Sequence, residues 1–306
     1  MEFSFLKSRP VGVRANTPTD FNFGDWKQIA VRTKDQIAKD NVGIVSAGVA
    51  FYTFLGLFPL LAAFVALYGL VASPEDVTAI VSSLQGVVPE DIIGVFETQL
   101  TRLVSEDSVA SYAAAISILI AVWSGSKAIK GMMAGLNIAY DESEDRNIFK
   151  KNGVALVLTL GGIITGMVAV FLVAGVPALF SYFNLGDFTQ TIVQLARWTL
   201  LAVLIISALS VLYRWAPNRK AVHWKWITPG SSMATFVWLL ASGMFSWYVS
   251  NFGNYNKTYG SLGAIAVLLI WLSISSFVFM LGAEVDSELE RQAGMNTKEG
   301  KRKKVT

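Results

Sequence analysis

The chain has 306 residues, a length that would suit about two soluble domains. Hydrophobic residues make up 53% of it and charged residues 15%, whereas an average soluble domain is roughly 25% charged. A chain this apolar would expose too much apolar surface in water, which excludes an ordinary soluble protein and indicates a lipid bilayer as its solvent. The net charge is only +3. The absence of cysteine excludes disulfides, thiolate metal sites and a cysteine nucleophile, and the one histidine, His223, cannot form a histidine cluster within one chain.

The first forty residues lack the apolar core, about 7–15 residues long, that a cleaved export signal requires. The apolar run from Val42 to Val71 is therefore predicted to act as an uncleaved signal-anchor. Before it, residues 1–41 are predicted to form a cytoplasmic segment with one interfacial helix, Trp26 to Lys39, capped by Asp25. The apolar residues of this helix share one face and basic residues fill the rest, which is typical of a helix on an anionic leaflet.

Six apolar segments are each long enough to cross the hydrocarbon core of a bilayer, which takes about 20 helical residues. They cover residues 42–71, 108–130, 153–181, 190–213, 227–250 and 259–283. Their long apolar runs differ from membrane β-strands, which alternate with a period of about two residues. The sequence therefore predicts an all-α polytopic membrane domain over residues 42–285, followed by a basic cytoplasmic tail over 286–306.

Between the first two spans, residues 73–107 form the one long segment that is predicted to be external. Ser73-Pro74 and Pro89-Glu90 have the order of helix starts, and apolar residues follow each of them at helical spacing. Two short amphipathic helices are therefore expected there, lying on the bilayer or covering the end of the bundle.

The distribution of basic residues predicts the orientation of the six spans. Of the 25 lysines and arginines, 22 lie before the first span, after the last, or in the segments that follow the second and fourth spans. The three exceptions are Arg102, Arg197 and Lys257. Basic residues concentrate on the cytoplasmic side of membrane proteins. Both termini are therefore predicted to be cytoplasmic.

Three motifs carry a resemblance to a known family. The first span has the pattern AxxAFYxxLxLFPLL from Ala47 to Leu61, and LNIAYD follows the second span from Leu136 to Asp141. The last span contains YGSLGA, WL and LGAE between Tyr259 and Glu284. In these motifs the chain resembles the YihY/BrkB family of bacterial inner-membrane proteins. The resemblance implies six spans and an inner-membrane location. It implies little about activity, since the family's label of ribonuclease BN is regarded as a misassignment and its other label is virulence factor.

A candidate substrate path combines cations, tyrosines and a helix start near the external face. Its residues are Tyr52, Pro59, Arg197, Lys257, Tyr259, Gly260 and Ser261. Two cations and the positive end of a helix dipole suit an anionic head group or a small anion. The alternative is that Arg197 reaches to the surface and the tyrosines form an interfacial belt. Pro59 is either a passive kink or a functional hinge.

A candidate inner gate lies near the cytoplasmic ends of the spans. It consists of Lys127, Lys130, Arg214 and Glu284. An ion pair of Glu284 with Lys127 or Arg214 is expected to close the inside of the bundle, and a substrate or proton relay is the alternative. The acidic run DESED, residues 141–145, is interpreted as a solvated loop rather than a Mg²⁺ site. The spacing Gly162-xxx-Gly166 is typical of close helix packing.

Motifs for catalysis are missing from the sequence. It contains no GxSxG, HExxH, P-loop or dinucleotide fingerprint, so we expect no enzyme, no metal and no cofactor. The preferred function is a transporter or flippase of a small anionic or amphiphilic solute. The alternative is a non-catalytic envelope protein that binds lipid or partner proteins, and a ribonuclease is disfavoured. Membrane lipids are the expected partners, and nucleic acid is not expected as a partner. The sequence leaves open whether the chain forms a homo-oligomer.

Overall fold

The computed structural model describes residue 15 and residues 17–69, 109–176, 187–219, 224–252 and 261–294, and every element in these residues is a helix. The elements are the 3-10 turn η2 (Pro18–Asp20), α1 (Phe23–Lys39), α2 (Val42–Gly69), α5 (Val109–Ala139), α6 (Ile148–Val170), the π-helical turn η3 (Phe171–Gly175), α8 (Asp187–Trp215), α9 (Trp224–Phe252) and α11 (Ser261–Gln292). The predicted all-α class is confirmed for these residues. The external helices expected over residues 73–107 lie outside them.

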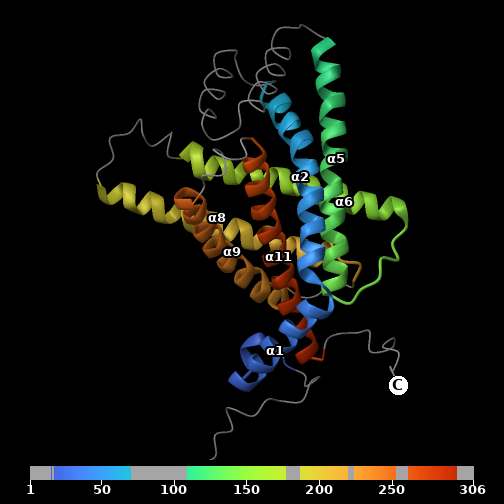
Figure 1. Ribbon diagram of the computed structural model, residues 1–306, viewed down its shortest axis with the longest axis vertical. Helices are drawn as coiled ribbons and strands as arrows, with labels where there is room; N and C mark the ends of the chain where they lie inside the picture. The colour runs from blue at the N-terminus through green and yellow to red at the C-terminus, as the bar shows by residue number, and fades with distance from the viewer. Residues whose placement is uncertain are drawn as a thin grey trace, which may run out of the picture.

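Three helices, α2, α5 and α11, run along the long axis of the molecule, and α6 and α8 cross their direction at a steep angle (Figure 1). The most closely packed pair is α2 with α5. Helix α11 contacts α1, α2, α5 and α9, so it is the central helix of the described structure. Residues on different sides of α11 therefore meet different partners.

Helix α1 begins with a reciprocal cap. The Asn22 side chain accepts a hydrogen bond from the Asp25 amide at 2.9 Å, and the Asp25 carboxylate accepts one from the Asn22 amide at 3.0 Å. The predicted cap at Asp25 is therefore wrong by three residues, because Asp25 is the acidic member of a capping box. Asn41, with a positive φ of 50°, then turns the chain, so that α1 and α2 meet at 64°.

Length and composition identify membrane-spanning helices among the described residues. Four helices qualify, over Ile148–Val173, Thr191–Trp215, Trp224–Val249 and Ile265–Gln292, and a fifth results if the bent pair of α1 and α2 counts as one span. Helix α2 continues through Pro59 to Gly69 without ending. A multi-pass helical membrane protein is thus confirmed, whereas the sixth span and the cytoplasmic position of both termini stay predictions.

Tight packing is concentrated at one end of the molecule, which we call the packed end. It consists of the first turns of α2, α6 and α9 together with the last turns of α5, α8 and α11, whose buried side chains form one apolar cluster. Away from it, large apolar side chains such as Val157, Leu195 and Met244 are about two-thirds exposed or more. Because exposing so much apolar surface to water is unfavourable, these side chains indicate contact with lipid.

Helices α9 and α11 touch backbone to backbone in the packed end. A Cβ added to Gly282 would lie 2.5 Å from the Tyr213 hydroxyl, 2.7 Å from Ala234 Cβ and 2.8 Å from the Gly230 carbonyl oxygen. A Cβ added to Gly230 would collide with the Gly282 carbonyl. Pro229 lies inside α9 rather than ending the helix. Two glycines therefore set the crossing of these helices.

Candidate functional site

Four carboxylates crowd the last turns of α11 in the packed end. They occur at every second residue, as Glu284, Asp286, Glu288 and Glu290, and none is more than 5% exposed. Two residues turn an α-helix by about 200°, so neighbours in this series point to opposite sides. Glu284 and Glu288 therefore share one face of α11, and Asp286 and Glu290 share the other.

The face with Asp286 and Glu290 meets α9 and the loop that follows α8. Asp286 Oδ1 accepts a hydrogen bond from the Gly230 amide at 2.7 Å. Arg219 Nη1 donates to both carboxylate oxygens of Glu290, at 2.8 and 2.7 Å. The Arg219 guanidinium also lies 3.7 Å above the ring centre of Tyr140. Burial, helped by the charge of Asp286, raises the pKa of Tyr140 well above its usual range, so the phenol stays neutral.

The face with Glu284 and Glu288 meets α1 and α5. Arg32 and Arg291 each donate to a Glu288 oxygen at 2.5 Å, and Arg291 also pairs with Asp141 at 3.2 Å. Neither oxygen of Glu284 has a hydrogen-bond partner among the described residues. Glu284 is therefore a buried acid without direct compensation.

The LNIAYD segment joins α5 to the loop after α8. Asn137 Oδ1 accepts a hydrogen bond from the Asn218 amide at 2.7 Å, and its Nδ2 donates to Glu144 at 3.2 Å. Arg146 holds Glu144 through two hydrogen bonds of 2.7 and 2.8 Å and donates to the Ala216 carbonyl at 2.7 Å. The hydrogen bonds from Arg146 lower the pKa of Glu144, although burial opposes them.

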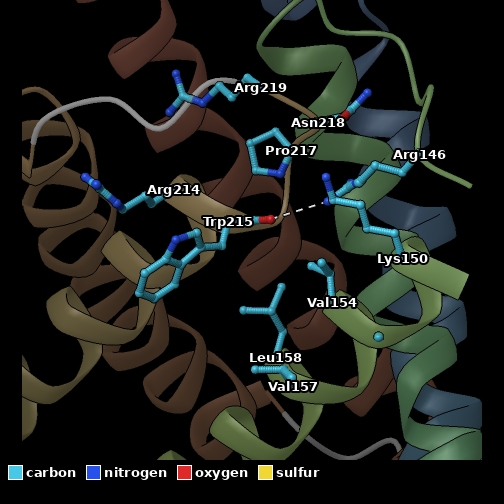
Figure 2. A pocket seen from close by; sticks show the side chains of 11 residues that line it. Arg146, Lys150, Val154, Val157, Leu158, Arg214, Trp215, Pro217, Asn218 and Arg219 are labelled. Atoms are coloured by element: carbon cyan, nitrogen blue, oxygen red, sulfur yellow. Dashed lines mark hydrogen bonds between the residues drawn. The ribbon is translucent and has the colours of Figure 1, made fainter.

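A cavity of about 530 Å³ opens beside this network, between α6 and α8. Its basic lining residues are Arg146, Lys150, Arg214 and Arg219, and none of the described residues that line it is acidic. Its apolar lining residues are Val154, Val157, Leu158, Trp215 and Pro217. Figure 2 shows Arg146 and Lys150 on the right, Arg214 on the left and Arg219 above, with the aliphatic side chains of α6 below them and with Arg146 donating to the Trp215 carbonyl. The cavity is therefore amphipathic.

The four residues of the predicted inner gate form no printed contact with one another among the described residues, and each has a different environment. Glu284 lies in the packed end, and among the described residues it pairs with neither Lys127 nor Arg214. The Arg214 guanidinium lies 4.7 Å from the ring centre of Trp224, Lys130 lies 5.4 Å from that of Trp123, and Lys127 is exposed. The expected ion pair is not formed among the described residues, and the inner gate stays a prediction. The arginines that pair with acids of α11 are Arg32 and Arg291, which bind Glu288, and Arg219, which binds Glu290.

The predicted external path lies largely outside the described residues. Lys257, Tyr259 and Gly260 belong to the part of the chain that is not described, as does His223, and Ser261 begins α11. Tyr52 is exposed and packs edge-on against Phe51. The Arg197 guanidinium lies 5.4 Å from the ring centre of Trp198. The external anion site therefore stays a prediction.

Several residues of the network were not singled out by their chemistry in the sequence, namely Asn137, Tyr140, Glu144, Arg146, Asn218 and Arg219. One signal existed, because Asn137 and Tyr140 belong to the LNIAYD motif. The interpretation of DESED as a solvated loop is wrong for Glu144, which bridges Arg146 and Asn137. Within the described residues, no group of three or more histidine or acidic side chains is arranged to hold a metal ion.

Long apolar helices with exposed apolar sides, closed at one end by buried ion pairs, define a multi-pass α-helical membrane protein. Residues 33–306 match the family model described as virulence factor BrkB, and the chain belongs to that family.

Similar proteins occur in several bacteria. The chain is 32% identical to the putative ribonuclease-like protein YfkH of Bacillus subtilis over 254 residues, which cover 81% of this chain and 90% of YfkH. It is 25% identical to the UPF0761 membrane protein PSHAa0171 of Pseudoalteromonas translucida, over 92% of this chain and 87% of the relative. It is also 25% identical to the UPF0761 membrane protein VV0203 of Vibrio vulnificus, over 82% and 78% of the two chains. No solved structure matches it.

Proposed function

We propose that the protein is a transporter or flippase of a small anionic or amphiphilic solute in the bacterial inner membrane, with six spans and both termini in the cytoplasm. The observation that carries the proposal is Glu284, a carboxyl group that is 1% exposed on an apolar helix and lacks a hydrogen-bond partner among the described residues. Burying such a group costs free energy. Ionisable groups inside membrane helices are rare and occur mainly on substrate, ion or proton pathways.

The buried ion pairs supply a gate for such a pathway. Alternating access requires that one end of a transporter be closed while the other is open. In the packed end, Arg219 with Glu290 and Arg32 with Glu288 tie α11 to the loop after α8 and to α1. A solute passing this end would have to separate these pairs. In the proposed orientation the packed end is therefore the cytoplasmic gate, and Glu284 lies within it.

Reconstitution into liposomes tests the proposal. We expect the protein to accelerate the movement of labelled anionic lipids, or of small organic anions, above the rate in empty liposomes. Glu284→Gln removes the uncompensated acid and should lower this rate at least tenfold. Asp145→Asn is the matched control, because it removes a carboxylate from the exposed loop that precedes α6. Wild-type protein that moves none of these solutes, or a fully active Glu284→Gln variant, would contradict the proposal.

The second candidate function is a non-catalytic envelope protein that binds lipid or partner proteins. It is favoured by the amphipathic cavity, which needs no transport cycle to hold a ligand. Neither candidate includes catalysis, although the name of the Bacillus relative contains the term ribonuclease-like. A ribonuclease assay of the purified protein tests this part. Cleavage that Glu144→Ala and Asp145→Ala abolish together would show that the acidic loop is catalytic.

A further inference from the structure

The cavity between α6 and α8 has two chemically different sides. In Figure 2, Arg219, Arg146 and Lys150 lie around its upper and right-hand parts, and Val154, Val157 and Leu158 lie below them. A soluble anion would use only the basic side, and an apolar molecule only the other. A ligand that fills both sides must itself be amphipathic and negatively charged.

Two of the basic residues are held in place from behind the cavity. Glu144 binds Arg146, and Glu290 binds Arg219 with both oxygens, while neither acid lines the cavity. These pairs fix the directions of the two guanidinium groups and neutralise them. Lys150, in the first turn of α6, is exposed and forms no ion pair with any described residue. The wall of the cavity therefore keeps positive charge that a ligand can compensate.

The position of the cavity suits a lipid. It lies where one candidate span begins, at Ile148, and another ends, at Trp215. That level is the boundary between hydrocarbon and head groups, and Trp215 and Trp224 pack edge-on there as interfacial aromatic residues do. Val157, which lines the cavity, is 68% exposed, so the apolar side communicates with the surrounding lipid. A lipid can enter sideways and keep its chains in the bilayer.

We propose that this cavity binds an anionic phospholipid, with its phosphate against Lys150 and the first part of its acyl chains against Val157 and Leu158. Basic pockets between membrane helices on the cytoplasmic side suit such head groups. The positive end of the α6 dipole lies at the same end of α6 as Lys150. The inference does not depend on transport, because a firmly bound lipid and a transported one would occupy the same contacts.

Quenching of tryptophan fluorescence by brominated lipid measures occupancy. The full-length protein is placed in phosphatidylcholine nanodiscs with increasing brominated phosphatidylglycerol, and brominated phosphatidylcholine serves as the neutral comparison. The Trp215→Phe variant identifies the signal that arises at the cavity. We expect saturable quenching by the anionic lipid and only weak, non-saturating quenching by the neutral one. Equal quenching by both lipids would overturn the proposal.

Two substitutions test the basic side. Lys150→Gln should weaken binding of the anionic lipid about fivefold, because each cation near a membrane surface contributes about 1 kcal/mol. Lys151→Gln is the matched control, since Lys151 carries the same charge one residue along α6 and does not line the cavity. Equal losses from both variants would indicate attraction to the whole surface and contradict a specific site.

A third substitution blocks the cavity without changing its charge. Gly153 lines it, and no atom lies within 4 Å of the Cβ that a substitution would add there. Gly153→Phe should therefore be accommodated by the fold, which an unchanged thermal unfolding temperature would verify, and should abolish saturable quenching. Unchanged quenching by a folded Gly153→Phe variant would overturn the proposal. Displacement of the lipid by millimolar inorganic phosphate would show a site for free phosphate instead.

Discussion

Arg219 illustrates how a single residue holds the packed end together. Its side chain is 5% exposed and that of Glu290 is 6% exposed, so the charge pair is buried. The same guanidinium lies on the ring of Tyr140 and donates to the Tyr213 carbonyl at 3.1 Å. One side chain therefore joins α5, α8 and α11.

Arg219→Met is expected to destabilise the protein by about 3–5 kcal/mol, because it leaves the buried carboxylate of Glu290 without its cation. Thermal or denaturant unfolding of the purified protein in detergent measures the change. Tyr140→Phe is the matched control. The Tyr140 hydroxyl has no hydrogen-bond partner among the described residues, so its removal should leave stability nearly unchanged. An equal loss in the two variants would contradict the role given to the ion pair.

Glu144 makes stability depend on pH. Its pKa is lowered below the ordinary value of 4.5 because Arg146 hydrogen-bonds to its carboxylate. A carboxylate with a lowered pKa stabilises the folded state at neutral pH, and this contribution disappears as the pH falls below about 4.5 and through the lowered pKa. Glu144→Gln should therefore be less stable than wild type at pH 7, and the difference should shrink at pH 3. A constant difference across this range would contradict the assignment.

At the scale of helices, glycine has different consequences at different places. Gly230 and Gly282 allow α9 and α11 to touch, whereas a Cβ at Gly162 or Gly166 would meet no atom within 4 Å. The Gly162-xxx-Gly166 spacing therefore does not pack against another helix within the described residues. A glycine motif indicates that another helix can approach closely at that position, but the packing of the fold determines whether one does.

Gly282→Ala is expected to destabilise the protein by about 1–3 kcal/mol, because its methyl group would overlap the Tyr213 hydroxyl and Ala234. Gly162→Ala makes the same chemical change on the open side of α6 and should be tolerated. The unfolding temperatures of the two variants in one detergent provide the comparison. Similar temperatures would show that the α9–α11 crossing is looser than described.

At the scale of the whole molecule, composition and the long apolar segments were sufficient to predict a multi-pass helical protein. Apolar runs of this length indicate a lipid environment, so they predict a membrane protein without any information on how the helices pack. The partners of Glu288 and Glu290 could not be predicted in this way. They depend on how α11 is rotated and on where α1 docks, and both are set by contacts between distant segments. The sequence showed that the end of α11 is acidic, but it did not show that Arg32, Arg219 and Arg291 form ion pairs with these acids.

The orientation of the whole molecule gives a separate prediction. A periplasmically active reporter fused after Gly86 should be active, and the same reporter fused after Lys151 or at the C-terminus should be inactive, because basic residues concentrate in the cytoplasm. Replacing the lysines and arginines of residues 1–41 with glutamine should weaken this bias. A cytoplasmic reporter position after Gly86 would contradict the six-span topology with both termini inside.

The ion pairs of the packed end also affect how the protein is made. Arg32 lies 256 residues before Glu288, and Arg219 lies 71 residues before Glu290, so both arginines leave the ribosome well before their partners. Chains are synthesised at about 5–20 residues per second, which leaves α1 undocked for many seconds. A truncated chain that lacks α11 would keep these arginines uncompensated. Helix α1 can therefore dock only after synthesis of the chain is complete. An undocked α1 would then mark an unfinished chain for quality-control proteases.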